Sequence, residues 1–116
     1  MTREEQVAVV ESYLEGLANK DFSKVPFAAY VTYESPLSSK LTGRQAVVEF
    51  LTGLFPAIKG IQIIQHIVEG EYVATVFDFE TIYGVIPIFD RFHVISGHLK
   101  TIRPFYDPRP ITEAPK

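Results

Sequence analysis

Four β-type segments follow one another in the second half of this chain, separated by very short connections. The segments are rich in Val, Ile, Phe, Thr and Tyr, and they cover Ile61–Val68, Tyr72–Tyr83, Val85–Ser96 and His98–Tyr106. Glu69-Gly70-Glu71 has the composition of a hairpin turn, and Gly84 and Gly97 interrupt the later segments. Such short connections join antiparallel neighbours, so this half predicts an antiparallel meander.

The first half of the chain has helical periodicity instead. Thr2 and Glu5 have the spacing of a capping box, and an apolar stripe follows at helical spacing as far as residue 18. Residues 22–30 indicate a turn or a second short helix, and a brief strand over 31–33 stops at Ser35-Pro36.

A second helix is predicted after a polar loop over residues 37–41. Thr42 and Gln45 repeat the capping-box spacing, an apolar helical face follows, and Pro56 ends it. Helices that precede an antiparallel meander predict an α+β fold.

Composition limits what this fold can do. The 116 residues suffice for one domain, and 47% hydrophobic residues provide a core that needs no metal or disulfide. A net charge of -3, with eleven dispersed Lys and Arg residues, argues against a nucleic-acid partner. The absence of cysteine excludes thiolate nucleophiles and cysteine-based metal sites. The acidic N-terminus precedes no long apolar run, so we expect no membrane anchor and a cytoplasmic protein.

The usual signatures of metal, nucleotide and serine-hydrolase chemistry are missing. His66, His93 and His98 fall on three different β segments without metal-ligand spacing, so we expect no metal. The glycines form no nucleotide-binding motif, no Gly-x-Ser-x-Gly occurs, and we expect no cofactor. His66 alternates with apolar residues, so it either reaches a cavity or is a buried histidine bonded to a neighbour.

Strand alternation singles out Asp90. Its neighbours at even positions, Ile86, Ile88, Phe92 and Val94, are apolar, and side chains two apart share one face of a strand. An aspartate on an apolar face is costly unless it is paired, protonated or directed into a cavity. Asp90 is therefore either a functional acid or a structural aspartate bonded to a neighbouring element.

The order of several short motifs resembles the nuclear transport factor 2-like superfamily, most closely its SnoaL-like and ketosteroid isomerase-like branch. The motifs are Ala18-Asn19-Lys20-Asp21-Phe22, Val31-x-Tyr33-Glu34-Ser35-Pro36, Thr42-Gly43-Arg44, Val68-Glu69-Gly70, Asp90-x-Phe92-x-Val94 and Ile102-Arg103-x-Phe105-Tyr106-Asp107. The resemblance covers residues 2–108 and implies a cone, in which N-terminal helices pack on a strongly curved, mostly antiparallel mixed sheet around an apolar pocket. It also implies one domain over 1–116, with a proline-bearing tail over 108–116, and a homodimer through the convex sheet face.

The resemblance assigns roles to individual residues. Tyr13 and Asp90 match the two residues that donate hydrogen bonds to the substrate oxyanion in ketosteroid isomerases. The family's general base is an aspartate directly before a proline, where this chain has Ser35, so steroid isomerisation itself is not expected.

The long segment Tyr72–Tyr83 has large apolar groups at both odd and even positions, so hydrophobicity alone favours Asp78 and Glu80 as a solvated edge. The resemblance reverses this preference and directs the even face inward, which makes Asp78 or Glu80 the candidate base. A bulge would shift the register by one residue and return both carboxylates to solvent. The expected pocket residues are Leu17, Ser35, Phe50, Leu54, His66, Val76, Phe92, Ile102, Pro104 and Tyr106.

Two functions follow as hypotheses. The first is a cofactor-independent acid-base enzyme of the isomerase, cyclase or dehydratase type, acting on a small hydrophobic ring compound. The second is a module of the same fold that binds a hydrophobic ligand or dimerises without catalysis. With the even face inward, Phe77, Phe79 and Tyr83 would form an exposed apolar surface, so a homodimer is predicted through them.

Overall fold

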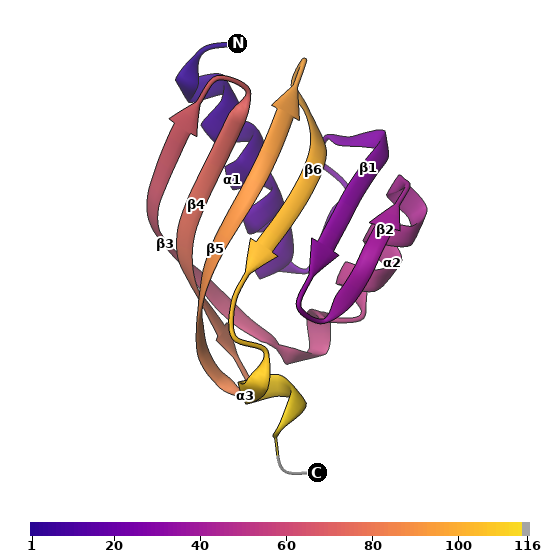
Figure 1. The fold of residues 1–116 in the computed structure, drawn as a ribbon, viewed down its shortest axis with the longest axis vertical. Coiled ribbons are helices and arrows are strands. Elements are labelled where there is room, and N and C mark those ends of the chain that lie inside the picture. The colour runs from indigo at the N-terminus through magenta and orange to yellow at the C-terminus, as the bar shows by residue number, and fades with distance from the viewer. Residues whose placement is uncertain (115–116) are drawn as a thin grey trace.

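The computed structural model describes residues 1–114, in which helices cover one face of a six-stranded mixed sheet (Figure 1). The strand order is β2-β1-β6-β5-β4-β3. The helical elements are α1 (Arg3–Asn19), α2 (Arg44–Thr52), a 3-10 turn (Phe55–Ala57) and α3 (Arg109–Thr112). The strands are β1 (Phe27–Ser35), β2 (Ser38–Thr42), β3 (Ile58–Glu69), β4 (Tyr72–Thr81), β5 (Gly84–Ile95) and β6 (His98–Phe105). The predicted α+β class is confirmed.

Helix α1 begins with the capping box that the sequence predicts. The Glu5 backbone N–H donates to the Thr2 hydroxyl (3.1 Å), and the Thr2 N–H donates to the Glu5 carboxylate (2.9 Å). Lys20 then ends the helix in a left-handed conformation. One side of α1 is buried against the sheet, and it includes Tyr13 and Leu17.

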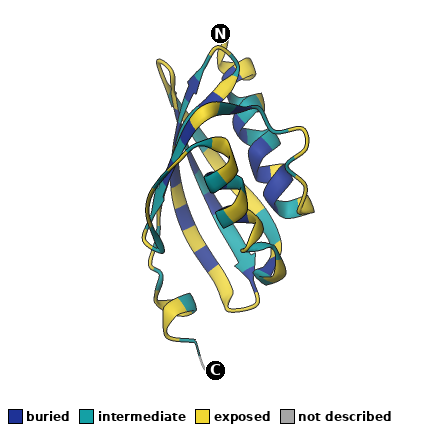
Figure 2. Ribbon diagram, turned by 90° about the vertical axis from the view of Figure 1, so that its right-hand side faces the viewer, coloured by how far each residue is buried: buried dark blue, intermediate teal, exposed yellow. Residues whose placement is uncertain are grey.

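The predicted meander is present in β3 to β6, whose neighbours pair antiparallel. Strand β1 adds to the other edge of β6 in parallel, which makes the sheet mixed. Register shifts interrupt the pairing of β3 with β4 at two places, and such bulges bend a strand. The sheet curves around α1 and α2, which both lie on its concave side (Figure 2).

Three local predictions for the first half of the chain are wrong. Residues 27–30 belong to strand β1 rather than to a turn or helix, and the expected polar loop over 37–41 lies largely within strand β2. The two strands form a hairpin around Pro36-Leu37. Pairing with β1 stabilises β2, whose polar sequence does not predict a strand. The second capping box does not form, because Gly43 and not Thr42 precedes α2 and makes no side-chain cap.

The alternation in β5 is confirmed, since Ile86, Ile88, Asp90, Phe92 and Val94 are all buried. The even-face-inward assignment of β4 is wrong. Residues Ile82 and Tyr83 form the turn between the two strands, and Thr81 pairs with Gly84. Each even position of β5 therefore faces an odd position of β4, as in the pair of Thr75 with Asp90. Paired residues share a face of the sheet, so the odd positions of β4 point inward.

The structure also contains a C-terminal segment after β6. Its helix α3 lies within the predicted tail over 108–116, of which residues 115 and 116 are outside the described part. Among the described residues, no helix has both the length and the apolar character that crossing a bilayer would need.

Candidate functional site

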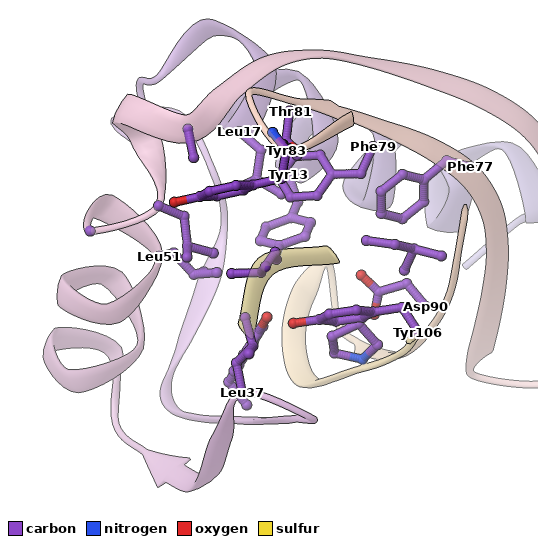
Figure 3. A pocket seen from close by; sticks show the side chains of 17 residues that line it. Tyr13, Leu17, Leu37, Leu51, Phe77, Phe79, Thr81, Tyr83, Asp90 and Tyr106 are labelled. Atoms are coloured by element: carbon purple, nitrogen blue, oxygen red, sulfur yellow. Dashed lines mark hydrogen bonds between the residues drawn. The ribbon is translucent and has the colours of Figure 1, made fainter. Parts of the chain in front are cut away.

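A cavity of about 150 Å³ lies between the concave side of the sheet, the two long helices and the C-terminal segment (Figure 3). Its wall is mainly apolar and includes Leu17, Leu54, Phe77, Phe79, Ile88 and Pro104. Leu37, Tyr83 and Ile111 come from three loop or terminal segments and complete the lining. The polar groups are those of Asp90, Thr81 and four tyrosines. The site is thus a small apolar chamber with few polar contacts, which is typical of a small-molecule pocket.

Asp90 is the residue that stands out in this chamber. It is 2% exposed, and its Oδ1 atom is buried without a hydrogen-bond partner among the described residues. Burial raises the pKa of Asp90 well above its usual value, because the charged carboxylate loses its hydration. The environment therefore favours the neutral acid, which can donate a hydrogen bond to a ligand oxygen.

Three tyrosines lie close enough to Asp90 for it to affect their pKa values. Burial, and then the neighbouring Tyr33 and Asp90, raise the pKa of Tyr13 well above its usual value. Burial and the nearby Asp90 also raise the pKa of Tyr33. Burial raises the pKa of Tyr106 as well, and the nearby Ser35 partly offsets this rise. All three phenols therefore stay neutral in the physiological range and are available as donors.

The ring of Tyr13 is held in place by other aromatic side chains. It stacks on Phe22 at 6.2 Å between centroids, and it meets the edges of Phe27 at 6.1 Å and of Phe92 at 5.6 Å. These contacts place the phenol of α1 next to a residue of β5, which is distant in sequence. Such packing fixes the hydroxyl of Tyr13 before any ligand arrives.

The structure brings together six of the residues expected from the sequence. Tyr13, Asp90, Leu17, Leu54, Pro104 and Tyr106 all line the cavity. Their catalytic or binding roles stay predictions.

Other expected pocket residues lie behind the wall. Phe92 and Ile102 are fully buried in the core, and Phe50 packs on Tyr33 with centroids 5.4 Å apart. Ser35 makes local hydrogen bonds, accepting from the Leu37 N–H at 3.2 Å. Ser35 does not line the cavity, but it lowers the pKa of two residues that do, Tyr33 and Tyr106.

The expectation that Val76, Asp78 and Glu80 enter the pocket is wrong. All three lie on the outer face of β4, because the odd positions of this strand face the cavity. His66 also lies outside the lining and bonds to Thr75 and Glu11. Phe77 and Phe79, expected in an interface, line the cavity together with Tyr83.

Sequence analysis missed Tyr33, Phe77 and Phe79 as pocket residues. The pairing of Thr81 with Gly84 implies that odd positions of β4 share a face with Asp90, so a two-residue turn would have identified Phe77 and Phe79. Tyr33 lies two residues after the buried Val31 on β1, so the alternation of side chains along a strand places both on the inner face. Ile111 carries no periodic signal, because it enters the pocket from the short helix after the sheet.

Two properties limit the chemistry of the site. Among the described residues that line the cavity, Asp90 is the single carboxylic acid and histidine is absent. In residues 1–114, no group of three or more histidines and acidic residues could hold a metal ion. The arrangement can donate hydrogen bonds to an oxygen atom from neutral groups in an apolar surrounding.

The sequence matches the family described as Domain of unknown function (DUF4904) over residues 1–116. This chain belongs to the DUF4904 family. A comparison of this DUF4904 protein with curated proteins gives no match.

Solved structures show which fold the DUF4904 protein has. An NTF2-like protein of unknown function from Cytophaga hutchinsonii has a TM-score of 0.79 at 17% identity, with 92% of this chain and 94% of the other covered. A ketosteroid isomerase-like protein from Kribbella flavida has a TM-score of 0.79 at 18% identity, covering 90% and 78%. A SnoaL-like protein of the polyketide cyclase type from Jannaschia sp. CCS1 has a TM-score of 0.81 at 14% identity, covering 97% and 94%. The resemblance stated from the sequence is confirmed, and the DUF4904 chain has an NTF2-like fold.

Proposed function

We propose that this protein is an acid-base enzyme for small, single-ring apolar compounds that carry a carbonyl or phenolic oxygen. The observation that carries the proposal is the buried Asp90 carboxyl, whose Oδ1 has no partner in the described part of the chain. Together with Tyr13, whose pKa burial and Asp90 both raise, it offers two neutral donors in the lining of an apolar chamber. The NTF2-like relatives of the isomerase and cyclase type support an enzymatic role.

The size of the cavity supports a single ring. An engineered apolar cavity of about 150 Å³ in another protein accommodates one benzene molecule, and the cavity here has about the same volume. A four-ring steroid exceeds this volume. The phenyl groups of Phe77 and Phe79 would contact the faces or edges of such a ring.

The chemistry follows from where charge develops. When a proton leaves the carbon next to a carbonyl, or when a bond to oxygen breaks, negative charge grows on the oxygen. Donors from Asp90 and Tyr13 stabilise this charge more than they stabilise the neutral ground state. Removing one such donor from other enzymes lowers the rate roughly 100- to 1000-fold. The reaction type is therefore an isomerisation, cyclisation or dehydration assisted by general acids.

A specific observation favours a second candidate, a binding protein without catalysis. Asp90 and the tyrosines are held neutral by burial, and the described lining contains no further carboxylate and no histidine to accept a proton from carbon. An enzyme of this design takes its base from solvent or from the substrate itself. Deuterium exchange separates the two candidates: an enzyme accelerates exchange of the protons next to the carbonyl of bound 2-cyclohexenone in D₂O, and a binding protein does not.

The first test is a set of calorimetric titrations with p-cresol, 2-cyclohexenone and a steroid enone as an oversized probe. We expect the single-ring probes to bind, and Asp90→Leu and Tyr13→Phe, which each remove a donor, to weaken binding about 10-fold, since a lost hydrogen bond is worth about 1.4 kcal/mol. Asp78→Leu and Tyr30→Phe make the same chemical changes on the outer face and on an exposed side chain. Equal binding by all five proteins contradicts the proposal.

A further inference from the structure

A hydrogen-bonded chain of three side chains lies beside the pocket and has no part in the proposed chemistry. His66 on β3 contacts the Thr75 hydroxyl with Nδ1 at 2.8 Å and the Glu11 carboxylate with Nε2 at 3.1 Å. Thr75 is fully buried, the His66 side chain is 11% exposed, and the Glu11 side chain is 44% exposed. The chain thus connects helix α1, at the surface, with the interior of β4.

With a neutral His66, the donors and acceptors in this chain can be arranged in one way. A carboxylate oxygen can only accept, so the Nε2 of His66 carries a hydrogen and donates to Glu11. In neutral imidazole the other nitrogen then has only a lone pair, so Nδ1 accepts from Thr75. Thr75 has a single hydroxyl hydrogen, and this arrangement directs it toward His66.

Thr75 is also the residue directly opposite Asp90. The two are paired across β4 and β5 and lie on the same inner face of the sheet. Side chains of directly paired residues have Cβ atoms roughly 5 Å apart, so rotation of the Thr75 side chain can bring its hydroxyl to Asp90. Yet Asp90 Oδ1 has no hydrogen-bond partner in residues 1–114. The commitment of the Thr75 hydrogen to His66 accounts for this.

We propose that His66, oriented by Glu11, is a positioning residue that holds the Thr75 hydroxyl away from Asp90 and so leaves Asp90 free for the ligand. This inference rests on the proposed function of the pocket. Without His66, the Thr75 hydroxyl turns and donates to Asp90 Oδ1. A hydrogen bond donated to a carboxylate favours its charged form, and a charged Asp90 cannot donate to a ligand oxygen.

Removal of Thr75 should rescue the ligand binding that removal of His66 weakens. In p-cresol titrations, His66→Leu weakens binding about 3- to 10-fold, because the bond from Thr75 favours the ionised form of Asp90, which cannot donate to the ligand. Thr75→Val alone leaves affinity within about twofold of the wild type, since it removes the hydroxyl that could bond to Asp90. The double variant restores affinity to that same range. His66→Gln, whose amide oxygen can accept from Thr75, keeps nearly all the binding.

The outcomes separate this inference from the proposed function. If wild-type binding depends on Asp90 but His66→Leu binds like the wild type, or the double variant binds as weakly as His66→Leu, the positioning role is wrong. If p-cresol does not bind at all, the proposed function fails, and the ligand-free proteins still test the inference. The ¹³C resonance of the Asp90 carboxyl then shifts toward the ionised position in His66→Leu and returns in the double variant. An unchanged resonance overturns the inference. His66→Phe serves if His66→Leu does not fold.

Discussion

At the scale of single residues, Asp90 dominates the behaviour of this protein. A buried carboxyl without a partner destabilises the folded state whenever it is charged. Its neighbours among the described pocket residues are phenols rather than cations, so no opposite charge compensates it there. Ionisation of Asp90 therefore costs stability, and a buried carboxyl with a strongly raised pKa in a cavity is characteristic of functional sites.

This cost predicts how stability depends on pH. Burial raises the pKa of Asp90 in the folded state. The stabilising contribution of this group to the free energy of unfolding is therefore fully present below the unfolded pKa of about 3.9. It is lost as pH rises toward the folded pKa, at up to about 1.4 kcal/mol per pH unit. We expect the free energy of unfolding of Asp90→Asn, relative to the wild type, to increase from pH 4 to pH 7.

Urea unfolding at four pH values measures this difference. Asp78→Asn is the matched control, because Asp78 lies on the outer face, and it should follow the wild type across the range. A difference between Asp90→Asn and the wild type that stays constant with pH would show that Asp90 titrates alike in both states.

The sequence identified Asp90 and Tyr13 but assigned the wrong carboxylates to the base. Asp90 could be predicted because a polar group interrupts an otherwise apolar alternation, and this signal is local. Asp78 and Glu80 were misplaced because the resemblance to the ketosteroid isomerase-like branch outweighed the hydrophobicity of β4, which by itself favours a solvated edge for both. Only the register with β5 decides which face is inner, and register depends on the turn at Ile82-Tyr83.

At the scale of secondary-structure elements, long segments with strong periodicity were predictable and short ones were not. Helix α1 and the meander from β3 to β6 lie within a few residues of their predicted bounds. Strand β2 consists of Ser38–Thr42, a polar stretch held by pairing with β1 rather than by its own propensity. Contacts with β1 likewise fix the start of α2, since the Gly43 N–H donates to the Val31 carbonyl at 2.8 Å and Arg44 donates to the Phe27 carbonyl at 2.7 Å.

Helix α1 provides a prediction that opposes helix propensity. Gly16 is buried inside α1, where alanine would favour the helix by roughly 1 kcal/mol. A Cβ atom at this position would lie 2.9 Å from the Asp21 carbonyl oxygen and 2.9 Å from Val25 Cγ2. We expect Gly16→Ala to lower the free energy of unfolding by about 1–3 kcal/mol, because backbone and core must shift.

Urea unfolding at pH 7 measures this change as well. Glu15→Ala, at the exposed neighbouring position of the same helix, should leave stability within about 0.5 kcal/mol of the wild type. A Gly16→Ala protein more stable than the wild type would mean that the loop after α1 does not pack on the helix as described.

At the scale of the whole molecule, the two faces of the sheet differ in what they contact. The concave face forms the pocket, which includes the aromatic residues that the sequence had suggested for an interface. The outer face carries its own apolar row, Val76, Phe89 and Phe105, paired across three adjacent strands. Phe89 and Phe105 are 43% and 48% exposed. Contiguous exposed apolar surface of this kind is characteristic of interfaces.

We expect this row to be covered by a second copy of the chain. Arg91 and Arg103 occur on the same face as Asp78 and Glu80, so a two-fold arrangement can bring opposite charges together. Sedimentation at micromolar concentration should give twice the 13.1 kDa of one chain. The double variant Phe89→Glu and Phe105→Glu should sediment as a monomer. The control Ile82→Glu, at the exposed hairpin turn, should still sediment as a dimer. A monomeric wild type would contradict the prediction.

The ionisation of Asp90 in the folded protein, measured with and without a ligand, decides whether the pocket is a neutral hydrogen-bond donor. The chain has four aspartates, Asp21, Asp78, Asp90 and Asp107, and ¹³C labelling of their carboxyl groups allows each to be titrated by NMR. We predict that one resonance, absent from Asp90→Asn, stays in the protonated position at pH 7 and shifts when p-cresol is added. If all four carboxyls ionise below pH 5, or if the Asp90 resonance ignores p-cresol, the pocket is not the neutral hydrogen-bond donor described here.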